Sequence, residues 1–75
     1  MTVETVCFAI FREIIRQSRQ SEFDEVMVLA HQDVIELLLD EQAASLAELE
    51  EQTGKSIRLQ TESLYMQDQF DVVLM

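Results

Sequence analysis

The chain has 75 residues, which is enough for one small domain with a single hydrophobic core and too few for a second core. Apolar residues make up 48% of it, a composition that is typical of a globular protein and argues against a disordered chain. Fifteen acidic residues against five basic ones give a net charge of −10. Such a chain repels a phosphate backbone, so we expect RNA contact to be weak at most.

Residues that bind soft metals are scarce. Cys7 is the only cysteine and His31 the only histidine, so neither an internal disulfide nor a zinc cluster can form within the chain. No apolar run approaches the roughly 20 residues that span a bilayer, and the N-terminus lacks the pattern of a signal peptide. We therefore expect a cytoplasmic protein without membrane contact, and no metal or cofactor bound by this chain.

The first predicted element is an amphipathic helix. From Val3 to Ile15 the apolar residues recur at spacings of three and four, which places them along one side of a helix. We expect Thr2 to be its N-cap, with Glu4 in the first turn near the positive end of the helix dipole. The pattern fades at 18–20, where the helix should end.

A strand and further helical sequence follow. The uninterrupted apolar run 26–30 predicts a strand that is buried on both faces. A helix beginning near 31–33 and a second apolar series after Asp40 and Glu41 predict two short helices or one bent helix. Gly54 is expected to end this stretch in the left-handed C-cap position.

Two strands complete the predicted order α-β-α-α-β-β. Ile57, Leu59 and Thr61 alternate with polar residues, which is the period of a half-exposed strand. After a polar loop at 63–69, residues 70–75 alternate again, and we expect these two strands to form an antiparallel hairpin. The order predicts an α+β fold in two layers, a three-stranded sheet covered by helices on one face. The relative direction of the first two strands stays open.

Three segments that span nearly the whole chain carry a family resemblance: TVETVCFAIFREIIRQ, VLAHQDVIELLLDEQAASLAELEEQTGKSIRLQ and YMQDQFDVVLM. Their most specific parts are the opening 2–7 and the closing 69–73. Together they resemble the C-terminal small domain of the ribonuclease E/G family, in its ribonuclease G branch. The resemblance implies that residues 1–75 are a single small domain at the C-terminus of a longer endoribonuclease.

The resemblance also implies a role. Members of this family cleave single-stranded RNA, mature ribosomal RNA and help to turn over transcripts, using magnesium held by aspartates in a preceding catalytic domain. A Cys-Pro-x-Cys zinc link between protomers lies just before the position of Thr2, and Cys7 does not match a zinc ligand. A non-catalytic accessory and assembly domain is therefore implied, with magnesium and zinc bound outside this chain. Its partners would be the catalytic domain of the same polypeptide, a second protomer, or both.

The residues themselves suggest a contact surface and no catalytic site. No nucleophile is accompanied by a base and an orienting third group, so we expect no catalytic residue. Seven residues are candidates for a partner surface: Phe8, Arg12, Arg16, Arg19, Leu64, Tyr65 and Met66. The three arginines share one outward helix face, where a solvated face paired with acids such as Glu13 is the favoured interpretation. For the aromatic, leucine and methionine candidates, two interpretations are equally favoured: they contact a partner, or they cap the end of the core.

Two acidic groups have simple explanations. Asp33, Glu36 and Asp40 follow His31 about one turn apart and suggest a site for a hard cation, but carboxylates along one helix do not converge without a second element. A charged helix face, with His31 at the helix entry, is the favoured interpretation. Another group forms a solubilising face: Glu48, Glu50 and Glu51.

Two other functions remain as alternatives. The order strand-helix-helix-strand-strand is also that of a KH domain, a single-stranded RNA-binding module. A KH domain needs a GXXG loop between its two helices, whereas the junction 39–43 holds two acids and no glycine. A free-standing acidic regulator that binds a basic protein by charge complementarity is the other alternative.

Overall fold

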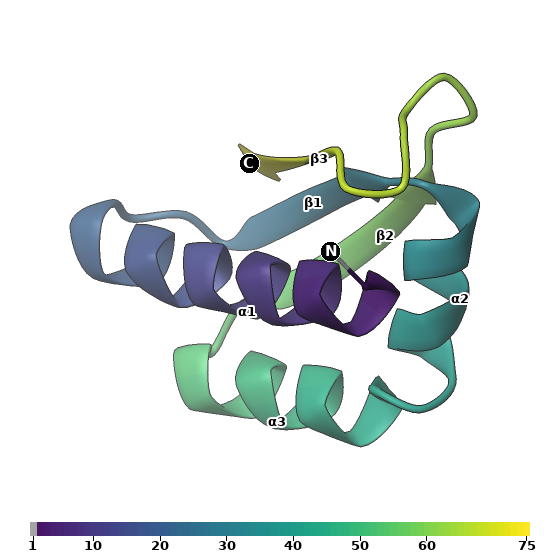
Figure 1. Cartoon of the computed structure of the whole chain (residues 1–75). Coiled ribbons are helices and arrows are strands. Elements are labelled where there is room, and N and C mark those ends of the chain that lie inside the picture. Colours follow the sequence, from purple (N-terminus) through teal and green to yellow (C-terminus); the bar gives the residue numbers. More distant parts are fainter. Residues whose placement is uncertain (1) are drawn as a thin grey trace.

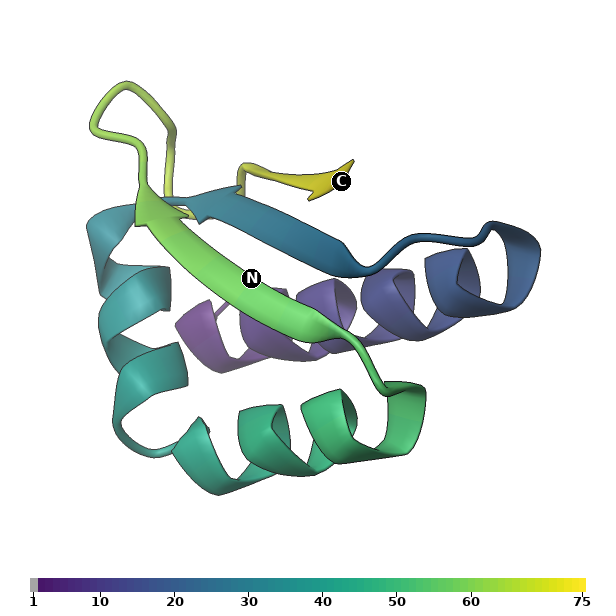
Figure 2. The same cartoon turned by 180° about the vertical axis from the view of Figure 1, so that it is seen from behind.

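Three helices and three strands follow one another in the computed structural model, which describes residues 2–75. Their bounds are α1 (Val3–Gln20), β1 (Glu25–Ala30), α2 (Gln32–Leu39), α3 (Ala43–Thr53), β2 (Ser56–Thr61) and β3 (Phe70–Leu74). The helices lie together on one side of the sheet (Figure 1), and the view from behind shows the same two layers (Figure 2). The predicted α+β class is confirmed. Within residues 2–75, no helix is both long and apolar enough to cross a membrane.

The helix ends follow the predicted capping residues. The Thr2 hydroxyl accepts a hydrogen bond from the Thr5 backbone N–H at 3.2 Å, as expected for the N-cap of α1. His31 caps α2, because its Nδ1 accepts from the Asp33 N–H at 3.0 Å. Gly54 ends α3 with φ at +69°, in the left-handed region. Two separate helices, α2 and α3, thus occupy the stretch where one bent helix was the alternative.

The strand order is β2-β1-β3, with β1 in the centre. Val28 of β1 lies opposite Leu59 in a parallel pair with β2, and opposite Val72 in an antiparallel pair with β3. The predicted β2–β3 hairpin is therefore wrong. The connection 62–69 is longer than the two to five residues of a typical hairpin loop, and it carries the chain past β1 to the opposite edge. The parallel β1–β2 pair settles the direction that the sequence had left open.

The core fills the space between the helices and one face of the sheet. Its fully buried members include Val6, Cys7, Ile10, Ile14, Val26, Val28, Ala30, Val34 and Leu38. On β1 every second residue belongs to this set, while Glu25, Met27 and Leu29 on the other face are only partly buried. The prediction that β1 is buried on both faces is thus wrong for the outer face, because the helices form a layer on one side only.

Candidate docking surfaces

The outward face of α1 carries most of the positive charge of the molecule. Arg12, Arg16 and Arg19, three of the five cations, are exposed there, as the sequence predicted. Phe8 is 48% exposed and lies one turn before Arg12, on the same face. Arg16 pairs with Glu13 at 3.5 Å, an exposed contact that contributes little to stability. Among residues 2–75, Arg12 and Arg19 form no ion pair, so this face can receive an anionic partner.

A shallow hollow separates this face from the edge of the sheet. Its volume is about 340 Å³, and it is lined by Ala9, Arg12, Glu13, Arg16 and Phe70. Two guanidinium groups and one carboxylate thus surround a partly apolar floor. The arrangement offers hydrogen-bond donors to an anionic group, but it is open to solvent and its own carboxylate opposes such a ligand.

The β2–β3 loop exposes the other predicted contact residues. Leu64 is 88% exposed and Met66 is 72% exposed, while Tyr65 is only partly exposed. In both views the loop projects beyond the end of the sheet where β1 and β2 finish (Figures 1 and 2). The structure therefore divides the seven candidates into two groups on different elements: four residues on α1 and three in this loop.

Two hydrogen bonds anchor the loop at its base. The Tyr65 hydroxyl donates to the Asp71 carboxylate of β3, and the Gln67 amide donates to the Asp33 carboxylate of α2 at 2.6 Å. The bond to Asp71 raises the pKa of Tyr65 above its ordinary value, and partial desolvation and nearby negative charges add to the shift. The loop is thus tied to both β3 and α2 while its apolar side chains stay exposed.

The outer face of the sheet is an apolar surface that the sequence analysis missed. Met27 and Leu29 of β1 lie beside Val73 of β3, with Met27 directly opposite Val73. Met75 continues the alternation of β3 onto the same face. Val73 is 42% exposed and Met75 is 50% exposed. The signal that could have revealed this surface is the unbroken apolar run of β1, whose outer residues need a cover that the helices do not give.

Polar groups border this outer face. The Arg58 guanidinium of β2 donates to the Glu25 carboxylate of β1 at 2.9 Å, where Arg58 is opposite Met27 in the register. Asp71 lies opposite Leu29 and accepts the Tyr65 hydrogen bond. The apolar centre and polar border match the usual layout of a protein–protein contact.

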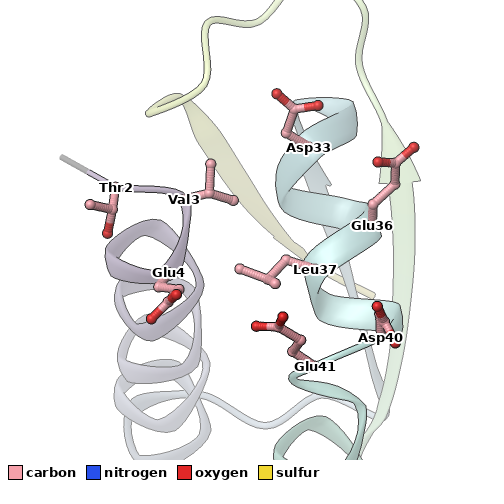
Figure 3. A pocket seen from close by; sticks show the side chains of 8 residues that line it. All are labelled: Thr2, Val3, Glu4, Asp33, Glu36, Leu37, Asp40 and Glu41. Carbon is pink, nitrogen blue, oxygen red and sulfur yellow. The ribbon is translucent and has the colours of Figure 1, made fainter.

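The acidic residues of α2 line an open hollow beside the N-terminus of α1. Its volume is about 490 Å³, and its lining is Thr2, Val3, Glu4, Asp33, Glu36, Leu37, Asp40 and Glu41. Leu37 and Glu41 extend toward α1, whereas Glu36 and Asp40 project from the other side of α2 (Figure 3). Within the described part of the chain, no group of three or more His, Cys, Asp or Glu side chains is placed to hold a metal ion. The carboxylates diverge, as expected for a solvated helix face.

Cys7 is a core residue. Its side chain is fully buried, and its sulfur lies 3.9 Å from the Val34 carbonyl oxygen. Burial raises the pKa of the Cys7 thiol, and the negative charge of Glu4 adds to this shift. A thiol with a raised pKa and no access to solvent is a poor nucleophile.

The junction between α2 and α3 does not have the features of a KH clamp. Asp40, Glu41 and Gln42 form the turn there, and Gly54, the only glycine in the chain, lies at the far end of α3. A nucleic-acid backbone would meet two carboxylates at this turn in place of close-approaching glycine backbone.

Comparison with known proteins finds relatives that all have the same name. No family model matches the chain. Ribonuclease G of Escherichia coli (strain K12) is 49% identical to it over 74 residues, and ribonuclease G of Salmonella typhimurium is 47% identical over 74 residues. Ribonuclease G of Haemophilus influenzae is 44% identical over 75 residues. Each match covers 99% of this chain and 15% of the relative. The resemblance found in the sequence is thus confirmed, and the chain is a homologue of one small segment of ribonuclease G.

Proposed function

We propose that the chain is the C-terminal accessory and assembly domain of a ribonuclease G-type endoribonuclease, which acts in the cytoplasm in ribosomal RNA maturation and RNA turnover. The observation that carries the proposal is the match at 44–49% identity over 99% of this chain, which covers only 15% of the relatives. A segment of this size with its own core has the properties of an added domain. Its partners are the catalytic part of the same polypeptide and a second protomer.

The domain contributes contacts to the enzyme, and the cleavage chemistry comes from the remainder. Among residues 2–75, the buried side chains are all apolar, and the carboxylates of the acidic hollow point in different directions. Phosphodiester hydrolysis with magnesium needs carboxylates that converge on the metal. The magnesium and zinc ions of the parent enzyme would accordingly be bound outside this chain.

Deletion of this domain from the natural polypeptide tests the assembly role. We expect the shortened enzyme to lose thermal stability or to form smaller assemblies, measured by differential scanning calorimetry and light scattering. Unchanged stability together with an unchanged assembly size would refute the proposal.

A second test uses the purified domain with single-stranded RNA and magnesium. We expect no cleavage, and any RNA binding should be weak and salt-sensitive, because Arg12, Arg16 and Arg19 neutralise at most about three phosphates. The slope of log K against log salt should then be no steeper than about −2. Magnesium-dependent cleavage by nuclease-free material would contradict the proposal, and saturable micromolar binding at moderate salt would favour the KH alternative.

A further inference from the structure

We propose that the outer face of the sheet, together with the exposed tip of the β2–β3 loop, is the surface by which this domain packs against the remainder of its own polypeptide. The inference rests on the proposed function, because it takes the domain to be part of a longer enzyme. The docking surface consists of six apolar residues: Met27, Leu29, Leu64, Met66, Val73 and Met75.

The composition of the central strand indicates that a layer is missing from this face. The apolar run 26–30 is typical of a strand buried on both sides. In the described structure, however, the helices cover one face only (Figures 1 and 2). The composition of β1 therefore calls for a cover that residues 2–75 do not provide.

Exposed large apolar side chains are more numerous in the β2–β3 loop and at β3 than on the helices. Of the six large hydrophobic residues that are exposed, four belong to the docking surface, namely Leu64, Met66, Val73 and Met75. Three of the six residues of the docking surface are methionines, whose flexible side chains adapt to an irregular partner. The ion pair between Arg58 and Glu25 borders it as a polar rim.

The size of the surface favours a tethered partner over a second copy. Three strands about 4.8 Å apart and six residues at about 3.3 Å each give a sheet face of roughly 15 by 20 Å. This is far below the roughly 800 Å² per partner that a stable complex of separate proteins buries. A tether raises the effective concentration to the millimolar range, so that a small apolar contact suffices.

The charge of the chain and the size of the relatives also favour a tethered partner over a second copy. Two copies that each carry a charge of −10 repel one another, which opposes self-association through a small apolar patch. The relatives match this chain over 15% of their length, so about 85% of such a polypeptide is available to cover the face. The occupant is therefore the remainder of the same polypeptide.

Methionine oxidation in the natural full-length protein tests the docking surface. Hydrogen peroxide is added, and the rate of sulfoxide formation at Met27 and Met75 is measured by mass spectrometry of their peptides. We expect Val73→Glu to raise both rates by about tenfold or more, because the added charge opens the contact. The matched control is Leu39→Glu, which changes an exposed apolar residue of α2 that belongs to neither candidate surface and should leave both rates unchanged.

Folding and the identity of the occupant are checked in the same samples. Cys7 stays unreactive toward iodoacetamide while the domain is folded, so labelling of Cys7 identifies a variant that has unfolded. If Val73→Glu unfolds the domain, Leu29→Gln is used in its place. Protection of Met27 that disappears on dilution, together with a fall in assembly size, would assign the surface to a second copy and overturn the inference. Equal rates of sulfoxide formation at Met27 and Met75 in the wild type and both variants would also overturn the inference. If deletion of the domain still changed stability or assembly, the proposed function would stand without this surface.

Discussion

The backbone N–H of Ile57 donates a hydrogen bond of 2.9 Å to the Glu50 carboxylate. The contact joins the start of β2 to the last turns of α3, across the short connection that contains Gly54. From the sequence, Glu50 belongs to a solubilising acidic face together with Glu48 and Glu51. The structure corrects this for Glu50, which is partly buried and bonded, while Glu48 and Glu51 are exposed.

Replacement of Glu50 should therefore destabilise the fold. We expect Glu50→Ala to lower the free energy of unfolding by about 1–3 kcal/mol, because the Ile57 N–H loses a charged acceptor at a partly buried position. Glu50→Gln keeps an acceptor oxygen and should cost less. Urea unfolding followed by circular dichroism measures both. The control is Glu51→Ala, which should change stability by less than about 0.5 kcal/mol; equal losses at 50 and 51 would show that the bond has no effect.

Gly54 should be sensitive to substitution through its backbone alone. Its φ is +69°, and a Cβ added there would meet no atom within 4 Å. Gly54→Ala should thus cost about 1 kcal/mol, from left-handed strain without a steric clash. Gly54→Asn should cost less, because asparagine tolerates this region. Thermal unfolding of both variants is the measurement, and a larger loss for Asn than for Ala would point to a steric cause instead.

The pKa of the Tyr65 phenol should lie above its ordinary value of 10.0. Tyr65 is the only tyrosine and the chain has no tryptophan, so absorbance at about 295 nm follows this one group during a pH titration. Asp71→Asn should lower the pKa of Tyr65 toward its ordinary value, since the hydrogen bond to the carboxylate is the main cause of the shift. Glu62→Gln, which removes a smaller contribution, should lower it less. A larger effect of the Glu62 variant would contradict the assignment.

The raised pKa of Cys7 gives a pH dependence of stability with a definite sign. Above the ordinary thiol pKa of 9.0 the unfolded chain loses the Cys7 proton while the folded chain keeps it. The contribution of Cys7 is therefore complete below pH 9, and the free energy of unfolding should fall as pH rises beyond it. Cys7→Ala should remove this component of the slope in urea titrations at several pH values. An unchanged slope in the variant would assign it to other groups.

The helices and the fold class could be predicted from the sequence because their signals are local. The spacing of apolar residues in α1, the capping hydroxyl of Thr2 and the left-handed Gly54 each depend on a few neighbouring residues, and the structure confirms all three. The strand order could not be predicted in this way. The apolar positions of β3 fit an edge of either β1 or β2, and only the length of the connection 62–69 favoured β1.

The same contrast between local and non-local signals separates the two candidate contact surfaces. The arginine face of α1 follows from helical spacing, and Arg12, Arg16 and Arg19 are exposed where the spacing placed them. The outer face of the sheet depends on how many layers cover it, which no local pattern records. The run 26–30 predicts burial on both sides but does not say which part of a polypeptide supplies each cover.

The central place of β1 affects how the protein folds during synthesis. β1 precedes both of its neighbours in the sequence, so during synthesis one hydrogen-bonding edge of this apolar strand stays open until β2 has emerged and the other until β3 has emerged. The backbone of Met75, just after β3, is hydrogen-bonded to the backbone of Asp24 and Glu25 at the start of β1. A nascent chain that stalls before β3 therefore presents an unpaired apolar edge, the kind of segment that chaperones recognise and that aggregates when they are absent.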